Sequence, residues 1–346
     1  LAERINAPVV TTISGQGIMP DQHPLALGVI GDNGYHPHAM RAVEEADVLL
    51  YVGCKMGSVS TVRWTLPSLK PGRCLLQVDV NPRIIGNTCP VDEAVVGDAK
   101  LVLEDVLAEL GPDVRNDSER WTDDLNRDRR HFWERAAAVL ASAEVPLSPQ
   151  RVIGSLNRVI REPAVVIADA GTATPYVTRY LKLNHDRSRF IIPRAYGGLG
   201  YAIPGVVGAW LARPEARPVG LFGDGSLGMS CGELETLVRC RVPAVLIHFN
   251  NGSFGWIKTL QKIHSESRYL SVDFTPLDAA RIAEAFGLRA FRAETPDQLE
   301  DGLQRAFAAD GPCLVDVLSR PIEDRIPPVF SWLKESGMDP LSKEPY

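Results

Sequence analysis

The sequence predicts an α/β protein made of two doubly wound domains, each built on a parallel sheet. Short apolar runs rich in Val, Ile and Leu alternate along the chain with segments of helical periodicity, which is the pattern of parallel strands covered by helices. Polar residues directly follow several of these runs, and open parallel sheets bind their ligands at the carboxyl ends of strands. We therefore expect a ligand site at one sheet edge.

The composition limits the classes of protein and partner. A chain of 346 residues is long enough for two ordinary domains. A formal net charge of -6 provides no basic field for nucleic acid, and no apolar segment is long enough to span a membrane. We expect no leader of charged and then apolar residues before Leu1, and the six cysteines lack the spacing of metal ligands. We expect a cytoplasmic protein that binds neither nucleic acid nor membranes.

The first predicted domain comprises residues 1–110. A β-branched run at 8–13 predicts a strand, and residues 44–53 pass from the end of a helix into another strand. A further strand is expected at 74–80, and the spacing of Leu and Val from 98 to 110 predicts a helix. These alternating elements predict a parallel sheet with helices on its faces.

Residues 111–147 are expected to connect the two domains. The polar segment 111–118 contains Pro and Gly and is the predicted boundary. The charged segment after it carries three aromatic residues at helical spacing, which predicts a surface helix that packs one stripe. Ser148 and Pro149 then suit the N-cap and the first position of a helix that opens the second domain, residues 148–346.

The second predicted domain repeats the alternation of strand and helix. A glycine-rich loop at 196–205 leads into a helix of small residues, and another helix is expected at 233–238. One more helix is expected within 273–290, and the chain ends in a Pro-rich segment. The strands of this domain are expected at 164–169, 218–222, 242–249 and 311–317.

Two polar tips are expected to meet at the edge of this second sheet. Asp224, between Gly223 and Gly225, follows one strand, and Asn251 follows the next strand along the chain. A carboxylate, an amide oxygen and a backbone carbonyl suit Mg²⁺ bound to a pyrophosphate group. The two glycines would let the backbone approach the phosphates, and the next helix would direct its positive end toward them. The alternative is a chance Gly-Asp-Gly turn followed by an Asn-Asn loop.

The Gly-Asp-Gly sequence followed by Asn-Asn resembles the thiamine-diphosphate (ThDP) motif of the acetolactate synthase and pyruvate decarboxylase superfamily. The resemblance implies a pyrophosphate-binding domain with ThDP and Mg²⁺ as cofactors. The metal ligands that it implies are Asp224, Asn251 and the backbone carbonyl of Ser253.

Further cofactor contacts are implied by the same resemblance. Gly225 and Ser226 would donate to the diphosphate, and so would the hydroxyl of Thr172, which equally suits a plain helix N-cap. The glycine-rich loop aligns with the stretch that holds the aminopyrimidine ring by the carbonyl of Gly197 and the amide of Leu199. Leu199 also stands where relatives place the apolar wedge that bends the cofactor.

The segment 250–269 resembles the one that lines the substrate channel of acetolactate synthases. Leu260 stands where acetohydroxyacid synthases carry a Trp that sets their second-substrate preference, and Trp256 stands where they carry Met. We expect Trp256, Ile257 and Leu260 to line a pocket of a different shape. The usual branched-chain biosynthetic reaction is therefore not the expected one.

Several nearby side chains have plainer interpretations. Met229 and Trp256 would pack near the thiazolium or belong to the core, and for Met229 the core is favoured. Asp169 is interpreted as a turn carboxylate and His248 as a satisfied core histidine. We expect Lys258 and His264 on an exposed helix face, and His36 and His38 in a loop without metal.

Residues 1–110 resemble the middle domain of the same superfamily, although a strand and a helix that begin this domain in relatives are missing. Some relatives bind FAD here, and the scaffold from Gly53 to Gly57 and Asp79 is present. Lys55 stands where FAD users tend to have Arg, so FAD is possible and a structural role is favoured. The resemblance depends on an ordered series of matches at 7–12, 15–17, 23–28, 45–50, 78–82 and 96–98.

No segment resembles the pyrimidine-binding domain, which carries the glutamate that activates the cofactor. We therefore expect either a two-gene enzyme split inside the middle domain or a fragment, with a separate partner subunit supplying the missing domain in a heterodimer or heterotetramer. The resemblance implies a ThDP- and Mg-dependent 2-oxo acid decarboxylase or carboligase, a lyase or transferase that is active only as a complex. The alternative is a catalytically silent regulatory or binding subunit. A dinucleotide oxidoreductase needs a Gly-x-Gly-x-x-Gly directly after a strand with a later acidic residue, and it is disfavoured because Leu199 and its neighbours fit that pattern poorly.

Overall fold

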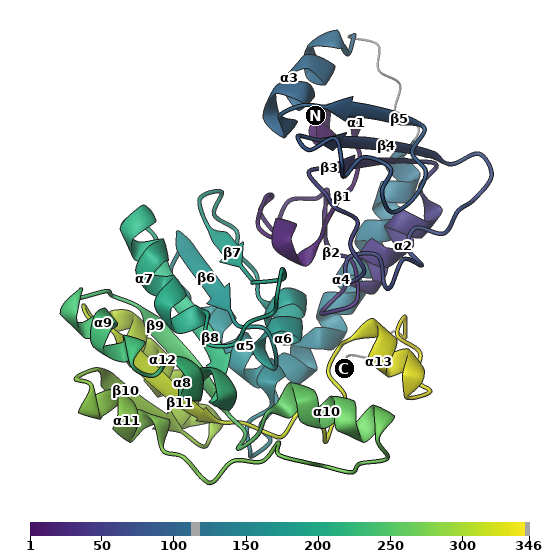
Figure 1. Ribbon diagram of the computed structural model, residues 1–346. Coiled ribbons are helices and arrows are strands. Elements are labelled where there is room, and N and C mark those ends of the chain that lie inside the picture. Colours follow the sequence, from purple (N-terminus) through teal and green to yellow (C-terminus); the bar gives the residue numbers. More distant parts are fainter. Residues whose placement is uncertain (112–117, 343–346) are drawn as a thin grey trace.

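The computed structural model describes residues 1–111 and 118–342 and contains a larger sheet and a smaller, two-part first region (Figure 1). Most of the predicted boundary at 111–118 lies outside the described residues. The first region ends with α3, and the larger sheet begins after α5. Figure 1 shows a long helix, α4 (Glu119–Leu140), running between the two parts.

The larger sheet has six parallel strands in the order β10-β11-β9-β8-β6-β7. Its central strands are buried along almost their whole length, which explains why their sequences are continuous apolar runs and do not alternate. The strands are β6 (Ala164–Ala168), β7 (Arg189–Ile191), β8 (Arg217–Gly223), β9 (Val245–Asn250), β10 (Arg289–Ala293) and β11 (Cys313–Leu318).

Helices cover both faces of this sheet, so it is doubly wound as predicted. Val166 and Ala168 of β6 join a core with α5, α6 and α12, while Val165 and Ile167 join a second core with α7, α9 and α11. Ser148 caps α5 by accepting a hydrogen bond from the Arg151 amide, as expected. The helices are α5 (Pro149–Val159), α6 (Ala173–Tyr180), α7 (Ala202–Ala212), α8 (Asp224–Ser230), α9 (Glu233–Arg239), α11 (Ala279–Ala285) and α12 (Pro296–Ala308).

The first region also contains only parallel strands, arranged as two small sheets, β1-β2 and β3-β4-β5. The outer strands β3 and β5 are largely exposed, and β4 is the best buried of the three. The elements are α1 (Ala2–Ile5), β1 (Val9–Thr11), the 3₁₀ helix η1 (Ile13–Gly15), β2 (Ala26–Val29), α2 (Pro37–Glu45), β3 (Val48–Val52), β4 (Cys74–Asp79), β5 (Glu93–Val96) and α3 (Ala99–Glu109).

The helix α4 is more than a surface helix. Leu125 packs in the core of the first region, whereas Phe132 and Ala136 pack in the core beneath α5. Its charged face remains exposed, so the predicted single stripe is confirmed but contacts both parts. The histidines predicted to lie in a loop are buried instead, because His36 is the N-cap of α2 and His38 lies in its first turn.

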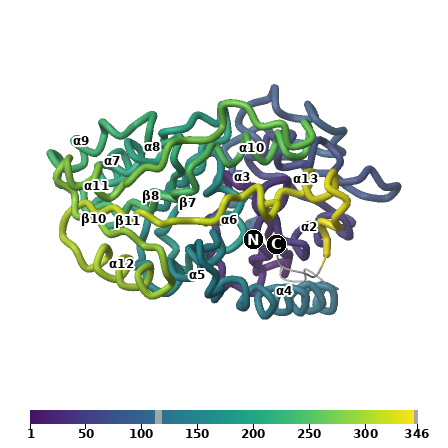
Figure 2. Tube along the Cα trace, turned by 90° about the horizontal axis from the view of Figure 1, so that it is seen from below, coloured from purple at the N-terminus to yellow at the C-terminus, as the bar shows by residue number. Residues whose placement is uncertain are grey.

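The end of the chain contains elements that the sequence analysis did not predict, namely β10, α12 and α13 (Phe330–Glu335). Figure 2 shows the C-terminal segment, in yellow, crossing from β11 past α10 (Gly255–His264) to α13. There it meets the first region, where the amide and hydroxyl of Ser331 donate to the Asp32 carboxylate. In residues 1–111 and 118–342, no helix is long and apolar enough to cross a bilayer.

Candidate functional site

The candidate site lies at the carboxyl ends of three adjacent strands, β6, β8 and β9. The chain leaves β6 for β7 on one side and returns to β8 on the other, which makes this point a topological switch in the sheet. Asp169 follows β6, Asp224 follows β8 and Asn251 follows β9. The fold therefore places three polar tips at one edge.

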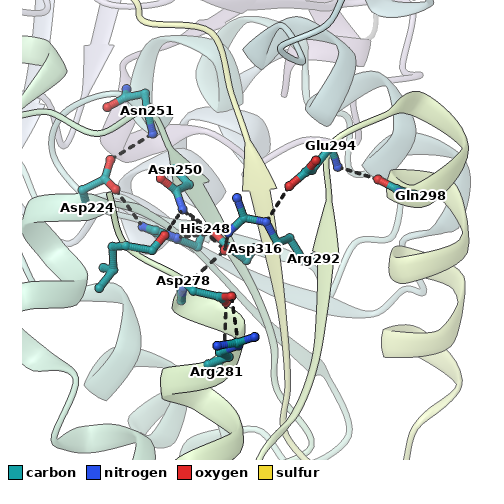
Figure 3. Close-up of polar contacts among 12 residues, drawn as sticks. Asp224, His248, Asn250, Asn251, Asp278, Arg281, Arg292, Glu294, Gln298 and Asp316 are labelled. Carbon is teal, nitrogen blue, oxygen red and sulfur yellow. Dashed lines mark hydrogen bonds and ion pairs between the residues drawn. The ribbon is translucent and has the colours of Figure 1, made fainter. Parts of the chain in front are cut away.

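Asp224 and Asn251 meet there, as the sequence predicts for two neighbouring strand ends (Figure 3). Asp224 is the first residue of α8 and is 6% exposed. Its Oδ2 accepts a hydrogen bond from the Asn251 amide at 3.0 Å, and its buried Oδ1 has no hydrogen-bond partner. Burial raises the pKa of the Asp224 carboxyl, although His248 and the Asn251 amide oppose the shift.

The loop after Asn251 is folded onto the side chain of Asn251. The Oδ1 atom of Asn251 accepts from the amide and the hydroxyl of Ser253, both at 3.2 Å, and its buried Nδ2 has no partner. Gly255 begins α10 beside this side chain, since a Cβ added there would lie 3.0 Å from Asn251 Nδ2 and 3.2 Å from Thr172 Oγ1. Thr172, Asn251 and Ser253 are thus brought together with Asp224.

The two glycines around Asp224 differ in what they permit. A Cβ at Gly225 would lie 2.2 Å from the Phe254 ring, so the absence of a side chain lets Phe254 pack over the start of α8. A Cβ at Gly223 would meet only the Phe249 carbonyl at 3.8 Å. The space beside Gly223 is open, whereas Gly225 is buried beneath Phe254, a packing role that the sequence did not reveal.

Asp169 fixes the glycine-rich loop and is more than a turn carboxylate. It is 1% exposed, and its two oxygens accept from the amides of Gly200 at 2.9 Å and Ala202 at 2.7 Å. Burial raises its pKa, while hydrogen bonding from the hydroxyl of the buried Ser226 and from these amides acts in the opposite direction. Asp169 therefore ties the end of β6 to the start of α7.

The loop itself presents backbone to the outside. Gly197 and Gly200 both have positive φ, at 65° and 79°, a conformation that favours glycine. The Leu199 side chain lies over the Asp169 turn, because a Cβ at Gly171 would be 3.8 Å from Leu199 Cδ2. Thr172 starts α6 without any side-chain capping bond, so the N-cap alternative does not account for its hydroxyl.

The residues expected to line a substrate pocket lie on α10. Trp256 packs against Trp332 of α13 with ring centroids 4.2 Å apart and ring planes tilted by 45°, while Ile257 is exposed and Leu260 is half-buried. The expectation that Met229 belongs to the core is wrong, since this side chain on α8 is 61% exposed. Met229 lies beside the glycine-rich loop, because a Cβ added at Gly200 would be 3.3 Å from Met229 Cβ.

Two ionisable residues of α10 have structural partners. Lys258 forms ion pairs with Asp273 at 2.6 Å and Glu323 at 2.9 Å, so it is not simply a solvated helix-face cation. His264 is about half exposed and lies 3.5 Å from Glu335. These contacts hold α10 to the segment that follows β11.

The sequence analysis missed the partners of His248. This side chain is fully buried as predicted, and its Nδ1 lies 2.9 Å from Asp316 Oδ1. Its Nε2 has no hydrogen-bond partner, so the expectation of a satisfied histidine is wrong for one of the two ring nitrogens. A single polar residue inside an apolar strand, such as Asp316 in β11, was the signal that could have indicated the pair.

The oxygen donors fit a hard cation such as Mg²⁺. One carboxylate, one amide and a nearby backbone carbonyl are the donor set that Mg²⁺ uses when phosphate oxygens complete its shell. The unpartnered Asp224 Oδ1 shows that this buried carboxylate is incompletely satisfied by the protein. Among residues 1–111 and 118–342, no cluster of three or more His, Cys, Asp or Glu side chains offers a site for a softer metal.

A separate cavity of about 510 Å³ adjoins the loop from Gly53 to Gly57 in the first region. Thr12 to Ser14 and Arg194 also line it. The cavity is next to the scaffold that some relatives use for FAD, and it lies outside the group formed by Asp224 and Asn251.

Comparison with known proteins gives two family matches. Residues 1–106 match the central domain of thiamine pyrophosphate enzymes, and residues 169–317 match their C-terminal TPP binding domain.

Individual relatives agree with these matches. The chain is 31% identical over 360 residues to a probable acetolactate synthase large subunit of Methanocaldococcus jannaschii, covering 100% of this chain and 59% of the relative. It is 30% identical over 331 residues to the corresponding protein of Methanococcus aeolicus, covering 91% and 54%. A pyruvate oxidase of Lactiplantibacillus plantarum is 29% identical over 320 residues, covering 92% and 52%. The chain thus spans about half the length of these curated relatives.

Proposed function

The chain belongs to the thiamine pyrophosphate enzyme family, whose central and C-terminal TPP binding domains it contains, and we propose that it anchors ThDP in a 2-oxo acid decarboxylase or carboligase. The observation that carries this proposal is the contact between Asp224 and Asn251 at the switch point of the sheet, with Oδ2 and amide nitrogen 3.0 Å apart. Such a pair of strand ends suits a metal that tethers a diphosphate.

Each residue of the site then has a proposed role. Asp224, the Asn251 amide oxygen and the Ser253 carbonyl would hold Mg²⁺, and the backbone at Gly223 and Gly225 would lie against the diphosphate. The hydroxyl of Thr172 would donate to the same group, and the Ser226 hydroxyl would do so by leaving its present bond to the Asp169 carboxylate. The metal ligands come from two strand ends, so their spacing is set by the sheet.

The glycine-rich loop would hold the rest of the cofactor. The Gly197 carbonyl and the Leu199 amide would contact the aminopyrimidine, and the Leu199 side chain would bend the molecule. When bound, ThDP supplies the nucleophilic carbon and the electron sink for cleavage beside a carbonyl group. Asp169 supports this arrangement by fixing the amides of Gly200 and Ala202. FAD is not part of the proposed cofactor set.

The proposed substrate-lining residues are Trp256, Ile257 and Leu260. Of these, Trp256 is also proposed to contact the cofactor. All three lie on α10, whose first residue, Gly255, is beside Asn251 and Thr172. A helix that starts at the metal site and extends away from it can line the approach to the cofactor. The relatives include a probable acetolactate synthase large subunit and a pyruvate oxidase, which agrees with a family in which this lining sets the substrate.

We further propose that a partner chain supplies the pyrimidine-binding domain and the activating glutamate, and that activity requires the complex. The loop that would face such a partner is open, with Tyr196 fully exposed and Gly197 and Gly198 also exposed. The six free cysteines agree with the reducing, cytoplasmic location expected from the sequence. The division into residues 1–110, 111–147 and 148–346 is part of the same proposal.

The direct test is Asp224→Ala, with the exposed Asp310→Ala as its matched control. Calorimetry would measure ThDP affinity with Mg²⁺ and with a chelator, in the presence of the partner chain. We expect the wild type and Asp310→Ala to need Mg²⁺, and Asp224→Ala to lose the Mg²⁺-dependent binding by about 100-fold or more. Unchanged binding by Asp224→Ala would end the metal assignment.

The alternative of a catalytically silent subunit makes a different prediction. The retained Asp224 and Asn251 pair argues against it, because a silent subunit does not need both metal ligands. A decarboxylation assay of the reconstituted complex over a panel of 2-oxo acids separates the two. Turnover that disappears with Asp224→Ala supports the enzyme, and binding without turnover of any acid supports the silent subunit.

A further inference from the structure

Two buried polar side chains, His248 and Asp316, continue from Asp224 into the interior of the sheet (Figure 3). In the sheet register, Phe222 of β8 pairs with His248 of β9, and His248 pairs with Asp316 of β11. Asp224 begins α8 just after β8, so three neighbouring strands bring Asp224, His248 and Asp316 into one row.

Asp316 is the fixed end of this row. It is 1% exposed and accepts hydrogen bonds from Asn250 Nδ2 at 3.1 Å and from the Ala279 amide at 3.2 Å, and Arg292 lies 3.4 Å away. Burial alone would raise the pKa of Asp316, but these partners and His248 lower it overall. Asp316 is therefore a charged, immobile acceptor for His248 Nδ1.

His248 is the middle of the row, and its two ring nitrogens differ. Nδ1 lies 2.9 Å from Asp316, which orients the ring, and a ring flanked by two carboxylates donates from both nitrogens only as an imidazolium. Nε2 lies 3.6 Å from Asp224 Oδ1, and both of these buried atoms lack a hydrogen-bond partner. A buried polar nitrogen and a buried carboxylate oxygen that face each other without a formed bond are costly to maintain.

The row is not needed to satisfy Asp316, since Asn250, Ala279 and Arg292 already contact that carboxylate. An apolar side chain at position 248 would complete the core beside Phe222, whose ring centroid lies 5.5 Å from the imidazole. What the histidine adds is a polar atom directed at Asp224 Oδ1. An orienting effect of His248 on the Asp224 carboxylate would explain why a histidine stands at position 248.

We propose that His248, held by Asp316, is a positioning residue that orients the Asp224 carboxylate for Mg²⁺, an inference that rests on the proposed function. Outer partners of metal ligands fix ligand orientation in this way. The separation of 3.6 Å exceeds a hydrogen bond, and a carboxylate shift of less than about 1 Å closes it. His248 acts on Oδ1, while the Asn251 amide holds Oδ2.

Two conservative variants separate the nitrogens of His248. The amide nitrogen of Gln occupies the place of Nε2, so His248→Gln keeps a donor facing Asp224 and loses the bond to Asp316. The amide of Asn occupies the place of Nδ1, so His248→Asn keeps the Asp316 partner and loses the atom facing Asp224. Both variants place a buried amide at the same position, which makes each the matched control of the other.

The measurement is the Mg²⁺ dissociation constant of the chain with ThDP in the presence of the partner chain, by calorimetry, beside the thermal midpoint of each variant. We expect His248→Asn to bind Mg²⁺ about 10- to 100-fold more weakly than wild type, and His248→Gln to stay within about fivefold. A purely structural histidine would give equal affinities for the two variants, or tighter binding by His248→Asn, and either result overturns the proposal.

A measurement on the wild type guards against variants that fail to fold. Nitrogen-15 NMR of the imidazole groups should show the Nε2 signal of His248 moving as Mg²⁺ is added with ThDP. The midpoint of this change should equal the midpoint of the calorimetric titration. An unmoved signal contradicts the inference. If the wild-type chain shows no Mg²⁺-dependent ThDP binding, the proposed function fails and this inference with it, whereas normal wild-type binding with equal variants removes only the role of His248.

Discussion

At the scale of single residues, Gly225 shows how closely packing and cofactor anchoring are combined. The Phe254 ring occupies the space where a side chain at 225 would be, and Phe254 is the N-cap of α10. One methyl group at this position would therefore displace the start of α10 from the start of α8. Asn251 and Ser253 lie in the loop just before Phe254 and would move with it.

We expect Gly225→Ala to lower the free energy of unfolding by about 1–3 kcal/mol and to abolish tight ThDP binding, because overpacking forces Phe254 out of place. Gly228→Ala is the matched control, since it lies on the same helix with no atom within 4 Å of an added Cβ. The control should be neutral or more stable by up to about 1 kcal/mol. Urea unfolding and calorimetry check both, and equal behaviour of the two variants would contradict the packing argument.

Asp21 is a second residue with a measurable effect, and it lies far from the site. Its Oδ2 accepts from the Leu183 amide at 2.7 Å, and burial raises its pKa to about 6. Because the folded chain holds this proton more tightly than the unfolded chain, the contribution of Asp21 to stability is lost as pH rises from about 4 through 6.

Asp21→Asn should therefore raise the free energy of unfolding by about 1–3 kcal/mol near pH 7.5 and change it little near pH 4. The Asn side-chain oxygen can still accept from the Leu183 amide, so the hydrogen bond survives. Urea titrations at the two pH values measure the difference, with the exposed Asp310→Asn as the control. A variant no more stable than wild type near pH 7.5 would show that Asp21 carries no buried charge.

The sequence indicated part of the site at this scale. Asp224 and Asn251 could be predicted because each directly follows an apolar strand, and parallel strands end at the same edge. The row from Asp316 to His248 could not, since it depends on β11 lying beside β9, and nothing in the local sequence gives strand order. Met229 was misplaced for a related reason, because a helix of seven residues shows little periodicity.

At the scale of elements, the tail after β11 holds α10 in place. Lys258 and Lys262 both contact Glu323, and Trp332, only 3% exposed, packs at a tilt against Trp256. The sequence analysis described this tail only as a Pro-rich segment and missed α13, which has only six residues and is stabilised by tertiary contacts. β10 and α12 were missed although α12 has a capping box at Thr295 and Gln298, a signal that was available in the sequence.

Trp332→Ala should loosen α10. Loss of this buried ring should cost about 3–5 kcal/mol of stability, and amides of residues 255–264 should exchange with solvent faster than those of β8. Trp64→Ala is the control, because Trp64 is 65% exposed and should change stability by less than about 0.5 kcal/mol. Hydrogen exchange by mass spectrometry gives the comparison, and unchanged exchange in α10 would show that the tail does not hold it.

At the scale of the whole molecule, the first region and the larger sheet meet at a polar seam around His36 and Arg179. His36 Nδ1 accepts from the Val29 amide at 3.0 Å and its Nε2 donates to the Arg179 carbonyl at 2.9 Å, as a neutral imidazole does. Burial, with Arg179 nearby, lowers the pKa of His36 to about 3. The Arg179 guanidinium donates to the Tyr35 carbonyl and lies 4.9 Å from the Phe132 ring centroid.

Arg179→Ala should weaken this seam, because it removes the bond to Tyr35 and leaves a cavity among three aromatic rings. We expect a loss of about 2–5 kcal/mol and a broadened unfolding transition, as the two parts lose their coupling. The exposed Arg187→Ala should keep the wild-type transition. Calorimetric scans compare them, and a sharp, unshifted transition for Arg179→Ala would contradict a coupled seam.

The fold class was predictable at this scale, while the arrangement of the parts was not. Alternating strand and helix signals gave two parallel α/β regions, and the larger sheet is doubly wound. The division of the first region into two small sheets could not be read from local patterns, because strand length and exposure depend on what covers each face. The seam likewise depends on buried polar residues that look like ordinary surface or loop residues in sequence.

The proposed cofactor anchor, Asp224 and Asn251, lies at strand ends, whereas the proposed substrate-lining residues lie on α10, which packs against α13. The selectivity for substrate can therefore be changed without altering the residues that bind the cofactor. A combinatorial library at Ile257 and Leu260, with Trp256 and Trp332 kept, should yield many clones that retain coenzyme and differ in the acids they accept. The sheet edge would stay constant among such variants, and the surface of α10 would be the part that differs.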